Sequence, residues 1–427
     1  MQTTSERDVR SRFQEMDAPE ALSARANYEP GPGARPRVNA HIHLPPNFSA
    51  FDTVDEAITL AADQGVSVLG ASNYYDYRVY ADFAEKASRR GIFPLFGIEI
   101  ITLDEELVRA GVKLNDPGNP GKMYVCGKGI VHFDPLSPQA SELLGVIRRK
   151  DSERMARMTA RLAEVIAASG FETGLDEDVV KEQVVRRHGS PKETVYLQER
   201  HVAQAFQEAL FERIPSGSRT EALTRIFGVA PKSPDDAAAV QNDLRSHLMK
   251  SGKPAYVQET FVDFDHAYRL ILALGGIPCY PTLADGASPP CGFETPVESL
   301  IASMKERNLY CAELIPIRNT PDVLTHYVRA MRGAGLIITA GTEHNTRDML
   351  PMEPTCVNGQ PIPDECGDIF WEGACVVAAH QYFVMRGEPG YVDESGRLNG
   401  SIANAEQRIA SFSALGAAVI KQYQLNR

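Results

Sequence analysis

The sequence has 427 residues, a formal net charge of −12, 43% hydrophobic residues and 23% charged residues. This composition is ordinary for a globular protein, and the length allows a barrel with one insertion. The negative charge disfavours nucleic acid as a partner, and no apolar run approaches the ~20 residues that cross a membrane. We therefore expect a small-molecule partner and make no prediction of the oligomeric state.

Residues 1–35 are polar and become rich in Pro and Gly toward their end. They contain no apolar core of the kind found in secretory signals, so we expect a loosely held leader. The seven cysteines include no Cys-x-x-Cys pair, and several lie in apolar segments where cysteine behaves as a small hydrophobic residue. This usage favours a reducing compartment, and we expect a cytoplasmic protein.

From residue 36 the sequence alternates between short β-rich runs and amphipathic stretches. Thr53–Glu56 fits a capping box that would begin a helix, and Gly65 would end that helix. The run IFPLFGIEII is apolar almost throughout, as expected for a strand covered on both faces. The predicted elements are strands over 37–42, 66–72, 92–101 and 122–131, with helices over 53–65 and 79–90.

Residues 139–250 break this alternation, because they contain no convincing strand. Four helical segments are predicted there, joined by stretches rich in Gly, Pro and Ser: 151–169, 175–188, 192–213 and 235–250. We interpret residues 139–250 as a helical insertion. The β/α alternation then returns, with helices over 265–275, 295–307 and 320–334, strands over 276–280, 309–315 and 336–341, and two outer helices over 364–385 and 401–424.

Seven strands that are mostly linked by helices predict a parallel α/β fold. Such strands can close into a barrel or remain an open sheet. Polar residues recur at the carboxyl ends of the strands, where functional groups gather in parallel α/β folds, and this favours a distorted TIM-like barrel. The barrel would comprise residues 36–138 and 251–427, with the last helices packed outside it.

Two histidines at the end of the first predicted strand indicate a metal site. His41 and His43 project to the same side of an extended segment. Glu99 lies in an apolar run, where a carboxylate needs a metal ion or a basic partner. Glu343 and His344 follow the last strand. Two histidines and two glutamates suit Zn²⁺, Mn²⁺ or Fe²⁺, with His344 as a fifth ligand or the acid/base; solvated histidines and a salt bridge at Glu99 are the alternatives.

These motifs, in this order, resemble those of the polymerase-and-histidinol-phosphatase (PHP) family. NAHIHL is similar to the family's opening His-x-His motif, FGIEI to its metal-bridging Gly-x-Glu motif, and AGTEHN stands where the family has Gly-Ser-Asp-x-His. ERHVAQAF and KSGKPAYV resemble segments of a subgroup with a helical insertion. The likeness is scattered over residues 36–350. It implies a metal-dependent phosphoesterase on a distorted seven-stranded β/α barrel.

The sequence departs from this family pattern at several expected metal ligands. Ser72–Asn73–Tyr74 replaces Thr-Asp-His, Tyr124 stands near the position of a fourth-strand His, Tyr280–Pro281 replaces His-Pro, and Glu343 replaces an Asp. A neutral phenol is a poor ligand for a divalent metal. Because family members often hold two or three ions, we predict that this chain holds one, bound by the two histidines and two glutamates named above.

Several side chains are candidates for binding a substrate that we expect to be anionic or sugar-like. The phenols of Tyr74, Tyr124 and Tyr280 would donate to an oxyanion or a sugar hydroxyl at the barrel mouth, although tyrosines at strand ends commonly pack only their rings. The resemblance to the PHP subgroup implies that Arg200 and His201 of the insertion face the barrel mouth and bind an anionic group of the substrate. A solvated helix face is the alternative for these two residues.

Three further residues are weaker candidates. Arg318, in the loop after the sixth strand, and Lys128, at the end of the fourth strand, would bind the same anionic group. His132 follows the fourth strand and would supply a replacement metal ligand. The remaining histidines fall on predicted helices or their ends, and we assign them no role.

A single Lewis-acidic ion lowers the pKa of water toward ~7. We therefore predict a metal-dependent hydrolase in which Glu99 and His344 are the catalytic residues, and the resemblance to the PHP family implies a phosphate ester as its substrate. Two alternatives remain open: a mononuclear metal enzyme for amide or lactone hydrolysis or for sugar isomerisation, and a binding protein without catalytic activity. The tyrosine substitutions favour the mononuclear enzyme, because in-line phosphoryl displacement benefits from two ions.

Overall fold

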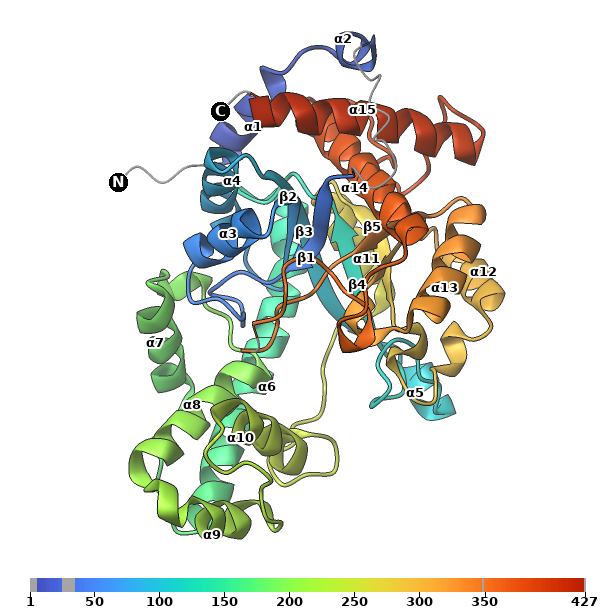
Figure 1. Ribbon diagram of the computed structural model, residues 1–427. Coiled ribbons are helices and arrows are strands. Elements are labelled where there is room, and N and C mark those ends of the chain that lie inside the picture. Colours follow the sequence, from blue (N-terminus) through green and yellow to red (C-terminus); the bar gives the residue numbers. More distant parts are fainter. Residues whose placement is uncertain (1–5, 25–34, 348, 426–427) are drawn as a thin grey trace.

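The computed structural model describes residues 6–24, 35–347 and 349–425 (Figure 1). Seven strands form one sheet in the order of the sequence, β1-β2-β3-β4-β5-β6-β7. Every predicted strand is present; β1 has the predicted bounds, and the ends of the other strands are shifted. The strands are β1 Arg37–Ile42, β2 Val66–Asn73, β3 Phe93–Leu103, β4 Lys122–Lys128, β5 Ile277–Thr282, β6 Cys311–Leu314 and β7 Ile337–Ala340.

The prediction that all strands are parallel is wrong for β4. This strand runs antiparallel to both β3 and β5, whereas the other neighbouring pairs are parallel. Leu103 at the end of β3 lies opposite Lys122 at the start of β4, so the connection between them stays at one end of the sheet. That connection holds only the short helix α5 Glu105–Ala110, and a parallel return would have required a crossover along the barrel.

The sheet nearly closes into a barrel where β1 meets the segment that follows β7. The backbone N–H of Glu343 donates to the carbonyl of His41 at 2.8 Å, and the N–H of His43 donates to the carbonyl of Glu343 at 2.9 Å. An isolated parallel bridge between Ile42 and Glu343 marks the same junction. The closure therefore brings a segment three hundred residues away beside the His-x-His motif.

Helices cover the outside of this barrel (Figure 1). Thr53 caps α3 as predicted, because its side chain accepts a hydrogen bond from the backbone N–H of Glu56. In Figure 1, α14 and α15 lie at the end of the barrel away from the insertion. The outer helices are α3 Val54–Asp63, α4 Val79–Arg89, α11 Phe264–Ala273, α12 Val297–Glu306, α13 Pro321–Gly333, α14 Asp364–Met385 and α15 Ala405–Leu425.

Residues 6–24 are not the loosely held leader that the sequence predicted. They form α1 Glu6–Gln14 and α2 Pro19–Ala24. Phe13 is fully buried in the barrel's hydrophobic core, and its ring centroid lies 5.9 Å from that of Phe93 and 5.5 Å from that of Tyr423. Burial of an aromatic ring anchors α1 against β3 and α15. The other parts of the predicted leader, 1–5 and 25–34, lie outside the described residues.

The helical insertion has a hydrophobic core of its own. It contains α7 Glu177–His188, α8 Glu199–Arg213, α9 Ser216–Phe227 and α10 Ala237–Leu244, and α9 was not predicted. The 31-residue helix α6 Pro138–Ala168 joins the two cores, because Leu144 belongs to the barrel core and Leu162 to the insertion core. Figure 1 shows the insertion extending from one end of the barrel.

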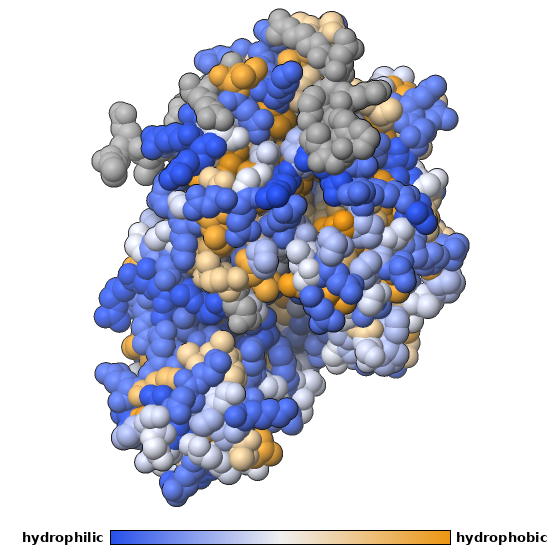
Figure 2. All heavy atoms as spheres, viewed as in Figure 1, coloured by the Kyte–Doolittle hydropathy of each residue, from blue (hydrophilic) through white to orange (hydrophobic). Residues whose placement is uncertain are grey.

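Hydrophilic residues cover most of the face seen in Figure 2, and the hydrophobic residues on it form small patches. Among the described residues, no helix is both long and apolar enough to cross a membrane.

Candidate metal centre

Three buried side chains from two strands converge at the mouth of the barrel. His41 lies on β1, His43 directly follows it, and Glu99 lies on β3. Oε2 of Glu99 is 3.1 Å from Nε2 of His43 and 3.4 Å from Nε2 of His41. Each residue offers a ligand atom within 4.8 Å of the others. The two-residue period of an extended strand thus brings both imidazoles to one carboxylate, as the sequence predicted.

The facing atoms of this group are unsatisfied. Three buried atoms have no hydrogen-bond partner among the described residues: Nε2 of His41, Nε2 of His43 and Oε2 of Glu99. The nitrogens lie close to the oxygen, but the angles between them are not those of hydrogen bonds. Buried polar atoms without partners are rare and cost free energy. One divalent cation would satisfy all three atoms, and a mixed nitrogen and oxygen set suits Zn²⁺, Mn²⁺ or Fe²⁺. The residues therefore fit a metal ion.

Neighbouring charges oppose the effect of burial on the pKa values of Glu99 and His41. Burial alone would raise the pKa of Glu99, but the two imidazoles hold this pKa well below its usual range. Burial would likewise lower the pKa of His41, but the Glu313 carboxylate, 2.7 Å from its Nδ1, raises this pKa well above the ordinary value. Glu99 is therefore ionised at neutral pH, as a metal ligand must be.

Glu343 lies beside this group without joining it. Its side chain pairs with Arg318, whose Nη2 is 2.5 Å from Oε2, and it accepts from Nδ2 of Asn345 at 2.7 Å. Glu343 and His344 both have left-handed backbone conformations, with φ of +61° and +47°, which are strained for residues with a side chain. The structure thus brings three of the four predicted ligands together. The fourth, Glu343, forms a salt bridge with Arg318 instead.

The structure directs His344 away from the barrel mouth. Its Nδ1 lies 2.6 Å from the hydroxyl of Thr342, and its Nε2 lies 3.1 Å from the carbonyl of Leu350. The ring stacks on Phe51 with 5.0 Å between centroids. Both nitrogens are thus occupied within the protein, and the arrangement gives no support to an acid/base role.

A cavity of about 380 Å³ separates the barrel mouth from the insertion. Tyr74 stacks on His43 with 5.2 Å between ring centroids. Burial, and then the nearby Glu99, raise the pKa of Tyr74 well above its ordinary value. Six of the predicted site residues line this cavity: Tyr74, Glu99, Tyr124, Arg200, Arg318 and Glu343.

Two predicted substrate-binding residues lie outside the cavity. The hydroxyl of Tyr280 donates to the buried carboxylate of Glu294 at 3.1 Å. His201 caps α8, where its Nδ1 accepts from the backbone N–H of Gln198 at 3.1 Å, and burial lowers its pKa to about 3. A neutral, buried imidazole cannot attract an anion by charge. Neither Tyr280 nor His201 lines the cavity where the sequence analysis expected a substrate.

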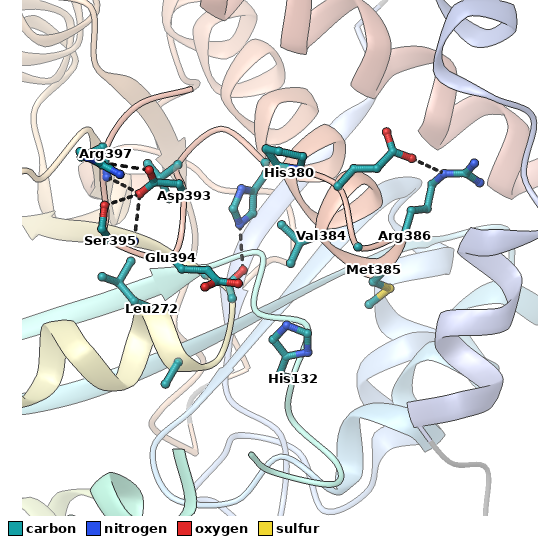
Figure 3. Close-up of a pocket in the computed structure, with 18 of the residues that line it drawn as sticks. His132, Leu272, His380, Val384, Met385, Arg386, Asp393, Glu394, Ser395 and Arg397 are labelled. Atoms are coloured by element: carbon teal, nitrogen blue, oxygen red, sulfur yellow. Dashed lines mark hydrogen bonds and ion pairs between the residues drawn. The ribbon is translucent and has the colours of Figure 1, made fainter. Parts of the chain in front are cut away.

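Two residues of β4 and the segment after it also differ from the prediction. Lys128 is buried and paired with Glu313 at 2.5 Å, so it does not face an anionic substrate. Because β4 is antiparallel, His132 lies at the opposite end of the barrel from His41. Figure 3 shows His132 with His380 in a second cavity, of about 1000 Å³. His132 therefore cannot replace a ligand at the mouth.

Sequence reasoning assigned no role to two residues that belong to the site, although Glu313 is among the polar residues that recur in the predicted strands. Glu313 contacts His41, and its signal was a carboxylate inside the apolar strand CAEL, the same signal that identified Glu99. Asp151 of α6 lines the mouth cavity, and burial raises its pKa to about 6. Its context, RRKDSER, is that of a solvated helix, so no local pattern indicated its burial.

Comparison with known proteins identifies the fold. No family model and no curated protein matches the chain. A solved structure from Bifidobacterium adolescentis, assigned as a metal-dependent phosphoesterase, matches with a TM-score of 0.50 and 16% identity over 79% of this chain and 96% of that chain. An amidohydrolase from Chromobacterium violaceum, solved with bound sulfate and no metal, matches with a TM-score of 0.48 and 19% identity over 78% of this chain and 96% of that chain. At 16% identity the likeness to the Bifidobacterium adolescentis structure establishes the fold alone.

Proposed function

We propose that this protein is a metal-dependent hydrolase that holds one divalent cation between His41, His43 and Glu99 and hydrolyses a phosphate ester. The observation that carries the proposal is the convergence of three buried, unsatisfied ligand atoms beside a cavity. The cavity volume of about 380 Å³ lies within the range of small-molecule sites. The PHP-like motifs and the fold shared with a metal-dependent phosphoesterase support the same assignment.

The cavity contains a cationic side chain suited to an anionic substrate. Arg200 reaches the cavity from α8 and has no ion-pair partner among the described residues. Burial and the neighbouring Arg245 lower its pKa to about 10, so it remains charged at neutral pH. Arg318 lines the same cavity but is paired with Glu343. A phosphate group would therefore meet a guanidinium that no carboxylate neutralises, and Arg suits the geometry of phosphate.

Tyr74 is our candidate for the group that donates a hydrogen bond to the reacting group. A divalent cation, when bound, supplies Lewis acidity and lowers the pKa of water. The raised pKa of Tyr74 keeps a proton on its Oη at neutral pH, and stacking on His43 orients the ring beside the metal ligands. We assign Tyr74 to binding an oxygen of the substrate, and Arg200 to binding its anionic group.

One observation favours a second candidate function, hydrolysis of an amide or a lactone. Tyr74 and Tyr124 line the cavity where the PHP resemblance would place further metal ligands. The group of His41, His43 and Glu99 therefore offers one cation site at the mouth. In-line phosphoryl transfer benefits from two ions, whereas one activated water suffices for an acyl substrate.

The two candidates are separated by a substrate screen of protein loaded with Zn²⁺, Mn²⁺ or Fe²⁺. We expect turnover of an aryl phosphate that a chelator abolishes and that added metal restores. Turnover of an anilide or a lactone without phosphate turnover would select the second candidate. A bound metal without turnover of any of these substrates would favour a binding protein, and failure to bind any metal would overturn both candidates.

The role of Arg200 is tested with two arginines of the same helix. Arg200→Ala should raise KM for the aryl phosphate by roughly 10- to 100-fold, because a charge-assisted hydrogen bond is lost. Arg213→Ala, at the other end of α8 and outside the cavity, is the matched control and should leave KM unchanged. Equal KM values in the two variants would contradict the assignment.

A further inference from the structure

A pair of oppositely charged side chains is buried behind His41. Nζ of Lys128, on β4, donates to Oε1 of Glu313, on β6, at 2.5 Å. The other oxygen of this carboxylate, Oε2, lies 2.7 Å from Nδ1 of His41. The side chains of Lys128 and Glu313 are 3% and 0% exposed. The three groups form a chain that ends at a proposed metal ligand.

Packing of the barrel core alone would not favour a buried ion pair at this place. Removing two charges from water costs free energy that their attraction often fails to recover, and an apolar pair of similar volume is often as stable. The space beside Lys128 is about 10 Å³ and is lined mostly by apolar residues, among them Leu95, Phe96 and Val377. Such a space is at the lower limit for one water molecule. A buried ammonium in these surroundings therefore indicates a role other than packing.

The geometry around Glu313 determines which nitrogen of His41 is available. Both carboxylate oxygens of Glu313 are engaged, one by Lys128 and one by His41, so the carboxylate is held on two sides. A carboxylate at Nδ1 keeps a proton on that nitrogen, so Nε2 is the nitrogen that would lose its proton and bind a cation. In this structure Nε2 of His41 faces Oε2 of Glu99 at 3.4 Å.

We propose that Lys128 and Glu313 are positioning residues that fix the tautomer and orientation of His41 for cation binding. Lys128 also brings a positive charge beside a second group of possible ligand atoms. His41, Cys126 and Glu313 form another group of possible ligand atoms within 4.8 Å of one another, and the ammonium of Lys128 is bonded to the carboxylate of that group. The inference rests on the proposed metal centre of His41, His43 and Glu99.

The test measures metal affinity and stability separately. Calorimetric titration with Zn²⁺ or Mn²⁺ is compared among the wild type, Glu313→Gln and the apolar double variant Lys128→Met/Glu313→Leu, and thermal unfolding is followed without metal. We expect both variants to bind the ion roughly 10- to 100-fold more weakly. The double variant should unfold at the same temperature as the wild type or at a higher one, since an apolar pair replaces a buried ion pair.

Glu294→Gln is the matched control, because Glu294 is a fully buried carboxylate outside the metal group, and it should bind the ion as tightly as the wild type. Unchanged affinity in both test variants, with normal binding by the wild type, would overturn the positioning role and leave the metal centre intact. A wild type that binds no metal would overturn both. Should the double variant fail to fold, Glu313→Gln, which preserves the side-chain volume, decides between the outcomes.

Discussion

The two ends of the barrel both hold buried histidines beside a cavity, but they differ in how the ring nitrogens are satisfied. At the mouth, Nε2 of His41 and Nε2 of His43 have no hydrogen-bond partner among the described residues. At the opposite end, Nε2 of His380 donates to the carbonyl of Gly275 at 2.9 Å, and its Nδ1 accepts from the backbone N–H of Tyr391 at 3.0 Å. The first arrangement leaves buried ring nitrogens available to a ligand, and the second leaves none.

Cavity size gives the opposite ranking of the two ends. The cavity around His132 and His380 has a volume of about 1000 Å³, and the one at the mouth about 380 Å³. Much of the charge in the larger cavity is already paired. Arg386 forms a salt bridge with Glu388, and Arg397 forms one with Asp393 (Figure 3). Unsatisfied buried atoms, and not the volume of a cavity, therefore distinguish the candidate site.

The largest expected effect tests whether the mouth binds a metal. Glu99→Gln replaces a carboxylate oxygen with an amide and should weaken binding of Zn²⁺ or Mn²⁺ by at least about 100-fold, more than the loss of a residue that only supports a ligand. Isothermal titration calorimetry measures this change. Binding within a factor of three of the wild type would show that Glu99 is not a ligand.

The residues that sequence reasoning placed correctly are those whose local pattern fixes their direction. The strand period places His41 and His43 on one side, and Glu99 is conspicuous because a carboxylate interrupts an apolar run. Both signals depend on a few neighbouring residues. The seven strands were predictable for the same reason, since apolar β-rich runs are local.

The residues that were misplaced depend on features that the sequence does not encode locally. Placing His132 correctly required knowledge of the direction of β4, and the sequence pattern of an apolar strand is the same in either direction. His344 required its left-handed φ of +47°, which turns its ring toward Phe51. Phe13 appeared to belong to a polar leader because its partners, Phe93 and Tyr423, are distant in the sequence.

A smaller effect is expected from the satisfied histidine at the opposite end. Burial lowers the pKa of His380 to about 4, so the folded protein binds fewer protons than the unfolded chain between this pKa and the ordinary value. The contribution of neutral His380 to the unfolding free energy is therefore complete above the pKa of the unfolded chain, and it is lost as the pH falls toward the pKa of the folded protein. Relative to His380→Gln, the wild type should lose about 2 kcal/mol of unfolding free energy between pH 7 and pH 5.

Urea unfolding of the two proteins at both pH values measures this difference. The metal affinity of His380→Gln should equal that of the wild type, because both ring nitrogens bond to backbone groups far from Glu99. A parallel decline of stability in the two proteins would show that His380 does not titrate as its burial predicts. A loss of metal affinity in His380→Gln would contradict the conclusion that only the mouth end of the barrel takes part in metal binding.

The smallest effect is expected at the two ends of one strand. His132→Asn removes a contact in which Nδ1 lies 3.0 Å from Nη2 of Arg10, which should cost about 1 kcal/mol of unfolding free energy and leave metal affinity and KM unchanged. Tyr124→Phe, at the start of β4, removes a hydroxyl from a residue that lines the mouth cavity and should raise KM without a comparable loss of stability. A parallel β4 would exchange these outcomes, because His132 would then lie at the mouth and Tyr124 at the opposite end. Measuring KM and urea stability for this pair of variants therefore tests the direction of β4, on which the separation of the two ends depends.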